Sequence, residues 1–241
     1  MTATTGPGTR AWASRTWTPL YRVAGAAALL FVLFDVAALA LYAVDAPPAS
    51  GGEATLQFIA GHKASYIAQQ LLWLVPSLFG LVVFTALLVA LLPTNAALAL
   101  LGFVVGAASW TALLAVPTSS VGTLSLVTLS DAWSAADDAA RPAFVAAAEA
   151  LVAENNTVTL AGALTPLGVL LISVPMVRGP LPHWMGWLGI ATGALGLASE
   201  VLRFAVTALY TVYGPLLWVW IAAVGIALLG LAGHRGRKAV E

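Results

Sequence analysis

Three ionisable side chains, Asp35, Glu200 and Arg203, lie inside long apolar stretches of this 241-residue chain. A charge at the centre of a bilayer costs about 2.5 to 3.5 kcal/mol even on insertion-based scales, so such residues usually pair, face a bundle interior, or have a function. Glu200 and Arg203 are three residues apart and therefore share one face of a helix. We expect Arg203 to pair with Glu200, or to reach Asp35 on a neighbouring helix.

The two carboxylates are expected at similar depth. At 1.5 Å per residue, Asp35 lies about 20 Å along its stretch from Arg22, and Glu200 lies about 24 Å along its stretch from Trp184. Three interpretations of the cluster stay open: a static ion cluster that fixes helix packing, a proton or ligand site, and an Arg203 side chain that merely extends to the outer headgroups.

Other polar residues fall in the outer halves of the apolar stretches, whereas the inner halves consist almost entirely of Ala, Leu, Val and Gly. This distribution predicts a polar cavity that is open to the outside and closed toward the cytoplasm. A small polar or amphiphilic ligand would suit it. The candidate lining residues are Asp35, Gln69, Gln70, Asn156, Glu200 and Arg203.

Several kinds of chemistry are excluded by residue type. The chain has no cysteine, so it has no disulfide, thiolate metal site, iron–sulfur cluster or cysteine nucleophile. His62 is expected outside and His183 and His234 inside, so no two histidines can share a haem or a metal. No HExxH, GxSxG or phosphate-binding glycine loop is present. We therefore expect a non-enzymatic protein without cofactor or metal, with intramembrane hydrolysis through Asp35 and Glu200 as the remaining enzymatic alternative.

The elements that must position these residues are membrane helices. The chain is 61% hydrophobic and 8% charged, whereas soluble domains carry about 25% charged residues. Six apolar stretches reach the ~20 residues that a helix needs to cross the hydrocarbon. We expect an all-α, six-span bundle over residues 22–232, between a flexible tail 1–21 and a basic tail 233–241. Its spans are predicted at 22–44, 65–92, 96–117, 157–177, 184–206 and 213–232.

The distribution of charge predicts the orientation. Both termini lie on the side that carries seven Lys and Arg residues, and the positive-inside rule places that side in the cytoplasm. The membrane is expected to be the inner (plasma) membrane. Most acidic residues fall in the two long outer loops. The net charge is zero, which gives no argument for nucleic acid. The inner basic residues are Arg10, Arg15, Arg22, Arg178, Arg235, Arg237 and Lys238, and the outer ones are Lys63 and Arg141.

The outer segment 118–156 is too structured to be a plain loop. Apolar residues from Pro142 onward follow helical spacing, and proline suits the first turn of a helix, so an amphipathic outer helix is expected there. Residues 121–129 are ambiguous, because they could continue the third span beyond Pro117 or form a partly re-entrant segment.

Aromatic and glycine residues give further expectations. Tyrosines and tryptophans near the span ends indicate aromatic belts at headgroup level, with Tyr42, Tyr66, Tyr210 and Tyr213 outside and Trp17, Tyr21, Trp184 and Trp187 inside. Two GxxxG pairs, Gly102 with Gly106 and Gly189 with Gly193, allow close helix approach and could serve a membrane-protein partner. Pro76, Pro166 and Pro175 are expected inside spans.

The segment YRVAGAAALLFVLFD leads a tyrosine–arginine pair directly into an Ala/Gly-rich first span. With the acidic, Ala-rich outer segment and the EVLR stretch in the fifth span, it resembles a family of small bacterial six-span membrane proteins classed as a domain of unknown function. The similarity covers roughly residues 20–232. It implies a fold and a membrane location, and no activity.

Three functions remain open from the sequence. The first is a non-enzymatic membrane protein whose outward cavity binds a small ligand or senses the cell envelope. The second is a proton- or ion-coupled transporter in which Asp35 or Glu200 carries the proton; the absence of a clear inverted repeat counts against it. The third is a structural subunit of a membrane complex.

Overall fold

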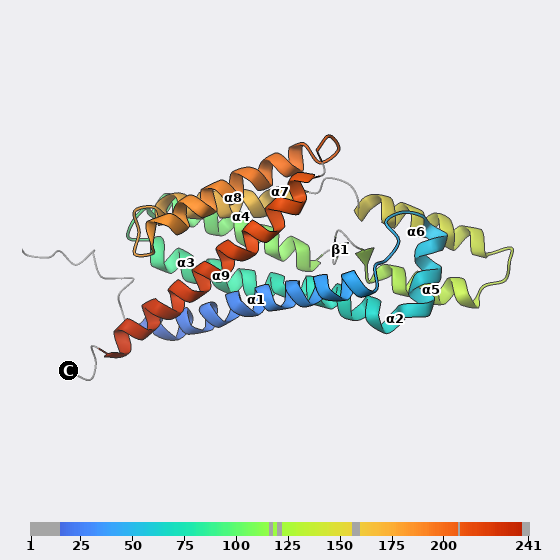
Figure 1. Cartoon of the computed structure of the whole chain (residues 1–241), viewed down its shortest axis with the longest axis horizontal. Helices are drawn as coiled ribbons and strands as arrows, with labels where there is room; N and C mark the ends of the chain where they lie inside the picture. Colours follow the sequence, from blue (N-terminus) through green and yellow to red (C-terminus); the bar gives the residue numbers. More distant parts are fainter. Residues whose placement is uncertain (1–14, 116–117, 120–121, 156–159, 207, 238–241) are drawn as a thin grey trace, which may run out of the picture. The chain divides into compact units, whose positions relative to one another are not determined.

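The computed structural model describes residues 15–115, 118–119, 122–155, 160–206 and 208–237. Apart from short connections, these residues are helical, with one pair of two-residue strands (Figure 1). In chain order the elements are η2 Arg15–Trp17, α1 Thr18–Val44, α2 Gly52–Leu74, α3 Pro76–Leu91, α4 Ala96–Ala115, β1 Thr118–Ser119, β2 Gly122–Thr123, α5 Ser125–Ala135, α6 Arg141–Asn155, α7 Leu160–Met176, α8 His183–Val201 and α9 Ala208–Arg237.

Four helical stretches are long and apolar enough to cross a membrane: α1, the joined α2 and α3, α4, and α9. This finding indicates an all-α membrane protein. α7 is apolar but has 17 residues, and α8 has 19 residues of which four are glycine and one is Glu200, which makes it less apolar. The count of six spans stays a prediction.

The second predicted span differs from the expectation at its start. α2 begins at Gly52 rather than Ser65, but its backbone leaves the helical conformation at His62 (φ −130°, ψ 31°), so the part after this kink begins close to the predicted Ser65. At Val75 the backbone stays helical (φ −57°, ψ −36°), and α2 and α3 form one 40-residue stretch in which Pro76 removes a single N–H donor. The kink separates the less apolar first part of α2 from the apolar part of the stretch.

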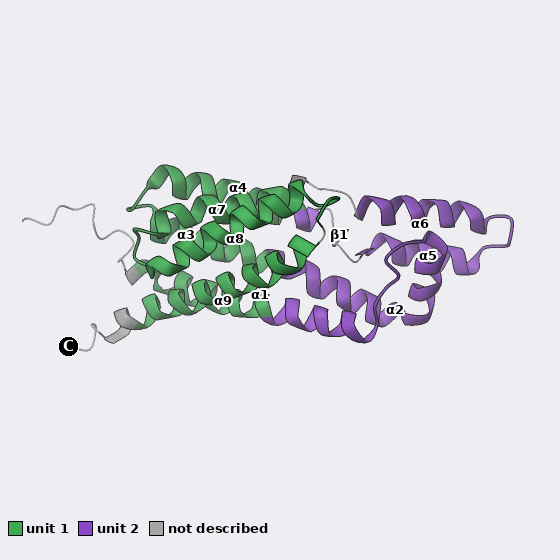
Figure 2. Cartoon of the chain, turned by 45° about the horizontal axis from the view of Figure 1, so that its top comes forward, with its two compact units in different colours: residues 1–32, 78–112, 158–241 green, residues 33–77, 113–157 purple. Residues whose placement is uncertain are grey.

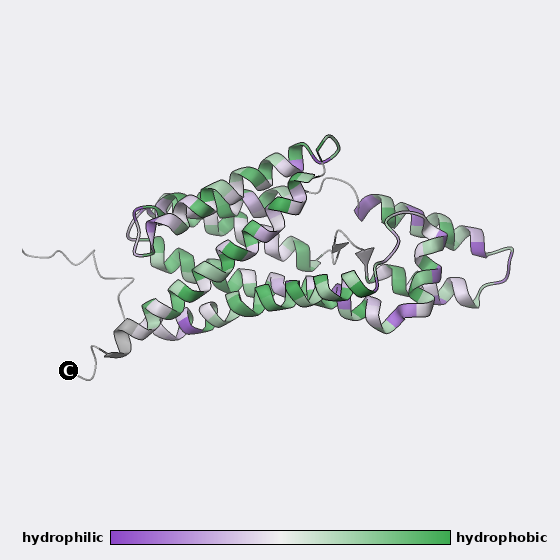
Figure 3. Ribbon diagram, in the orientation of Figure 1, coloured by the Kyte–Doolittle hydropathy of each residue, from purple (hydrophilic) through white to green (hydrophobic). Residues whose placement is uncertain are grey.

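The chain divides into two compact units (Figure 2). Unit 1 consists of residues 1–32, 78–112 and 158–241, and unit 2 consists of residues 33–77 and 113–157. Each unit is described separately below. Figure 3 shows that hydrophilic residues recur along α5, α6 and the first part of α2, whereas α3 and α4 are largely hydrophobic.

Unit 1 has a core of large aromatic side chains from four helices. Phe31 of α1 contacts Trp110 of α4 edge-on, with 5.5 Å between ring centroids. Phe84 of α3 lies 6.4 Å from Trp110 and 6.3 Å from Trp220 of α9, again edge to face. This is the arrangement that aromatic quadrupoles favour. The row of rings therefore joins α1, α3, α4 and α9.

Glycines bring the remaining helices of unit 1 together. A Cβ on Gly102 would lie 2.6 Å from the backbone nitrogen of Ile172 in α7, and one on Gly106 would lie 2.3 Å from the Phe84 ring. A Cβ on Gly189 or Gly193 of α8 would likewise come too close to atoms of α7. Both GxxxG pairs are buried and pack within the chain. Whether a membrane-protein partner binds this chain stays a prediction.

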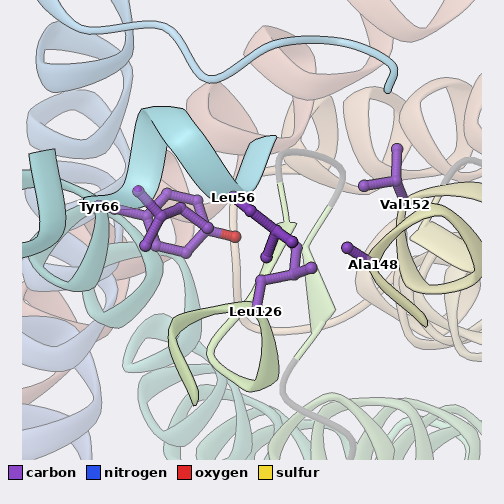
Figure 4. Close-up of a cluster of buried hydrophobic side chains, with 6 residues drawn as sticks. Leu56, Tyr66, Leu126, Ala148 and Val152 are labelled. Carbon is purple, nitrogen blue, oxygen red and sulfur yellow. The ribbon is translucent and has the colours of Figure 1, made fainter. Parts of the chain in front are cut away.

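Unit 2 contains a small core of its own (Figure 4). Leu56 and Tyr66 of α2, Leu126 of α5, and Ala148 and Val152 of α6 point toward one another, and Phe144 and Val145 pack against them. Ala148 and Val152 are four residues apart, as one face of a helix requires. A helix is thus found in the segment expected from Pro142 onward; its outer location stays a prediction.

Residues 118–119 and 122–123 bear on a segment that the sequence left ambiguous. Thr118 lies opposite Thr123 and Ser119 opposite Gly122 in an antiparallel pair, and α5 follows. The third predicted span therefore does not continue as one helix through residues 122–129, because the strand β2 lies between α4 and α5. Whether this segment is partly re-entrant stays a prediction.

Candidate functional site

Glu200 is positioned by the connection between α8 and α9. It lies in the last turn of α8, Arg203 follows in the turn after the helix, and Tyr210 lies in the first turn of α9. The spacing of three residues brings Arg203 back toward Glu200, as expected from the sequence. We call Glu200, Arg203 and Tyr210 the Glu200 cluster.

Both carboxylate oxygens of Glu200 are engaged. Arg203 Nη1 donates to Oε2 over 3.4 Å, and the Tyr210 hydroxyl donates to Oε1. The Arg203 guanidinium also lies over the Tyr210 ring, 5.0 Å from its centroid, so cation–π attraction adds to the ion pair. Glu200 is 2% exposed. A buried carboxylate of this kind is stable only while its partners stay in place.

Sequence reasoning missed Tyr210 as a partner of this carboxylate and Tyr213 as a neighbour of Tyr210. The sequence assigned both to an aromatic belt, but Tyr213 is buried, with its ring edge-on to Tyr210 at 6.0 Å and packed against Gly196 of α8. A usable signal was present, since both pairs, Glu200 with Arg203 and Tyr210 with Tyr213, have helical spacing and flank one short turn.

Asp35 cannot be assigned to this cluster. It is buried in α1, but it belongs to unit 2, whereas Glu200 and Arg203 belong to unit 1. Asp35 has an interaction of its own within the structure. The predicted cluster of three ionisable side chains therefore stays a prediction as far as Asp35 is concerned.

A second polar group lies inside unit 2, where Tyr66 joins α2 to the strand pair. Its hydroxyl accepts from the Thr123 backbone N–H at 3.1 Å and donates to the Thr123 carbonyl at 3.2 Å. Gly122 has φ +148°, which side chains rarely adopt, and a Cβ there would lie 2.0 Å from the Tyr66 hydroxyl oxygen. Only glycine permits this contact.

Gln69 and Gln70 complete what we call the polar core of unit 2: Tyr66, Gln69, Gln70 and Thr123. All four side chains are buried. Gln70 lies beside the strands, with its Nε2 3.2 Å from the position that a Cβ on Gly122 would take. Gln69 is 1% exposed, and its Oε1 has no hydrogen-bond partner among the residues that the structure describes. The predicted candidate Asn156 lies outside the described residues.

The aromatic belts need a matching revision. Tyr66 is buried in the polar core, and Tyr21 of α1 is fully buried in unit 1. Trp184 and Trp187, by contrast, are exposed at the start of α8, as residues at a membrane interface should be. Within the described ranges, no group of three His, Asp or Glu residues could hold a metal ion.

The comparisons with known proteins give one result. A family model described as a domain of unknown function, DUF4386, matches residues 23–234, which is most of the chain. No curated protein and no solved structure matches the chain significantly.

Proposed function

We propose that this chain, which belongs to the DUF4386 family of domains of unknown function, is a non-enzymatic membrane protein whose unit 2 binds a small polar ligand at Gln69. The observation that carries the proposal is the Oε1 atom of Gln69. More than about nine in ten buried polar groups in native proteins have a partner, and leaving one unpaired costs about 1 to 3 kcal/mol. A ligand that offers an N–H or O–H group would remove this cost.

Gln69 lies within one helical turn of Tyr66, the residue that joins α2 to the strand pair. Tyr66 holds the strand pair by hydrogen bonds to the N–H and the carbonyl of a single residue, Thr123. The hydroxyl and the amides of the polar core supply donors and acceptors but no net charge, so a neutral or weakly charged polar molecule fits better than an ion. Asp35 and Asn156 remain candidates for the same ligand.

The membrane arrangement belongs to the same proposal. We place the two long loops, residues 45–64 and 118–156, on the outer face and the termini in the cytoplasm of the inner membrane, with six spans. The basis is charge: seven Lys and Arg residues lie on the side of the termini, whereas only Lys63 and Arg141 lie on the side of the long loops. The positive-inside rule retains basic segments in the cytoplasm. A ligand-binding unit outside would allow the protein to sense the cell envelope.

The two alternatives have less support. A transporter that protonates Glu200 would have to release that carboxylate from Arg203 and Tyr210, both of which bind it here. A structural subunit is consistent with the Glu200 cluster, but it leaves the unpaired amide of Gln69 without a purpose.

The test is a thermal-shift measurement on the purified protein in nanodiscs, against a panel of amino acids, polyamines, polyols and small amides. We expect at least one compound to raise Tm by about 2 to 4 °C, the equivalent of roughly 1 kcal/mol in a chain of this size. Gln69→Met should abolish the shift. Gln57→Met is the matched control, because Gln57 is exposed on the same helix and should leave the shift unchanged.

Two results would contradict the proposal. One is that no compound changes Tm while Gln69→Met makes the protein more stable, since the amide would then be an unpaired group without a ligand. The other is a shift that survives in Gln69→Met, because binding would then take place elsewhere.

A further inference from the structure

We infer that unit 1 contains a separate buried binding site, in which one water molecule is held between Ser173 of α7 and Trp220 of α9 beside Gly189 of α8. This inference uses no residue of unit 2 and does not depend on the function proposed above.

The geometry converges on Gly189. A Cβ built on this glycine would lie 2.0 Å from Ser173 Oγ and 2.3 Å from Trp220 Nε1. The two polar atoms are therefore no further apart than the sum of these distances, although no hydrogen bond joins them. A molecule to one side of such a pair can accept from the indole N–H and donate to the hydroxyl oxygen at the same time.

Both side chains are completely buried, and neither Ser173 Oγ nor Trp220 Nε1 has a partner in the described part of the chain. Thr192, one turn beyond Gly189 on α8, is also fully buried with an unpaired hydroxyl. Unpaired groups are especially costly among membrane helices, because no solvent is present to bind them. Three of them within one turn of α8 indicate a missing hydrogen-bonding molecule rather than three independent defects.

The other close-packing glycines of α8 meet different atoms. Gly186 faces Val177, just after α7, and Gly193 faces the backbone and an aliphatic carbon of α7. Gly196 faces Pro166 and the Tyr213 ring. Gly189 is the one position of these four at which polar side-chain atoms come closest. The small-residue face of α8 therefore explains the close approach of the helices, and the two unpaired side chains mark where along that face a polar molecule binds.

Water fits this position in bonding. Buried waters typically make about three hydrogen bonds to groups that would otherwise be unsatisfied. Trp220 Nε1 supplies only a donor, whereas Ser173 Oγ can accept, so the ligand must be both acceptor and donor. An ion would lack a counter-charge, because none of the three side chains is ionisable. The alternative is that Trp220 bonds to Ser173 directly, and the experiment distinguishes the two.

The experiment uses NMR on the full chain in nanodiscs, with ¹⁵N-labelled tryptophan. The chain has nine tryptophans, and Trp220→Phe assigns the indole signal of interest by removing one of the nine. We expect a cross-peak between the Trp220 indole proton and a long-lived water in the wild type. Ser173→Ala should abolish this cross-peak and lower Tm by about 2 to 4 °C.

Ser199→Ala is the matched control. Ser199 is a fully buried serine of α8 whose hydroxyl already donates to the Gly196 carbonyl, so its removal should leave the water cross-peak intact. The inference is overturned if the wild type shows no water cross-peak at Trp220, whether or not Ser173→Ala shifts the indole signal, since such a shift alone would mean direct bonding. It is also overturned if Ser173→Ala raises Tm and leaves Trp220 unchanged.

Discussion

Unit 1 brings its helices together where side chains are absent, whereas unit 2 joins its elements through polar side chains. In unit 1 the backbones approach at glycines, and the space between them is filled by the rings of Phe31, Phe84, Trp110 and Trp220. In unit 2, Tyr66 binds Thr123, Ser130 donates to the Leu56 carbonyl at 2.8 Å, and Glu149 accepts from the Gly52 N–H.

We propose that the difference reflects solvent: unit 1 packs as helices do in lipid, whereas α5, α6 and the first part of α2 in unit 2 pack as a domain does in water. In lipid the hydrophobic effect does not drive helices together, so close packing at small residues has to do so. In water an apolar core forms readily, and polar side chains fix the register. The cluster around Leu56 and Leu126 and the ion pairs on the surface of unit 2 are typical of a small soluble domain. Substitutions in each unit can test this comparison.

The largest effect is expected from Gly193→Ala in unit 1. Its Cβ would lie 2.6 Å from Leu170 Cβ and from the Pro166 carbonyl oxygen, so α7 and α8 would have to separate, at a cost of about 3 kcal/mol. Thermal unfolding in detergent measures it. Gly230→Ala is the control, because nothing lies within 4 Å of that position and alanine should add up to about 1 kcal/mol of stability. Equal effects of both changes would refute close packing as the basis of unit 1.

Glu200→Gln should have the next largest effect, about 2 kcal/mol, because Arg203 and Tyr210 would lose a charged acceptor in a buried position. Chemical denaturation of the wild type and the variant provides the comparison. Glu53→Gln, an exposed position of α2, should change little. If Glu200→Gln is as stable as the wild type, the cluster does not stabilise the connection between α8 and α9, and a functional role for Glu200 regains weight.

Tyr66→Phe should cost about 1 to 2 kcal/mol, because the N–H and the carbonyl of Thr123 lose their shared partner. The loss should be local, so hydrogen exchange ought to rise in residues 122–155 and stay unchanged in α7 and α8. Tyr42→Phe, which removes a hydroxyl from α1, serves as the control. Faster exchange throughout the chain would show that the two units do not respond separately.

The smallest effect is expected from Lys63→Met. Lys63 binds Asp131 at 2.6 Å, but the two side chains are 46% and 58% exposed, and exposed ion pairs contribute less than about 1 kcal/mol. The loss should therefore be within about 0.5 kcal/mol in dilute salt and should vanish in 1 M salt, where charges are screened over about 3 Å. A larger loss that persists in salt would contradict the picture of unit 2 as a water-exposed unit.

Much of the fold could be predicted from hydropathy. The ends of α1, α4 and α7 lie within a few residues of the predicted spans, because long apolar stretches have few alternatives to a helix. The extension of α2 back to Gly52 could not be predicted in the same way. Residues 52–64 mix polar residues with Leu56, Phe58 and Ile59, and the segment packs against α6, where Glu149 binds the Gly52 N–H.

The candidate site was predicted in part. The pairing of Glu200 with Arg203 follows from their spacing. Gln69 and Gln70 were expected to line a cavity open to the outside, and the structure shows both side chains buried. Tyr210 and Tyr66 were assigned to aromatic belts instead, because sequence position near a span end does not reveal whether a ring faces lipid or another helix.

The sequence by itself determined the class of this protein, its apolar helices and the unequal distribution of charge along the chain, because hydropathy and charge are read from successive residues and need no knowledge of spatial neighbours. Only the tertiary structure decided which polar atoms meet. Ser173 and Trp220 lie far apart in sequence, and they converge at Gly189 because that residue lacks a side chain on the face where three helices pack. Such a contact depends on the rotation of each helix about its axis, which packing sets and composition does not.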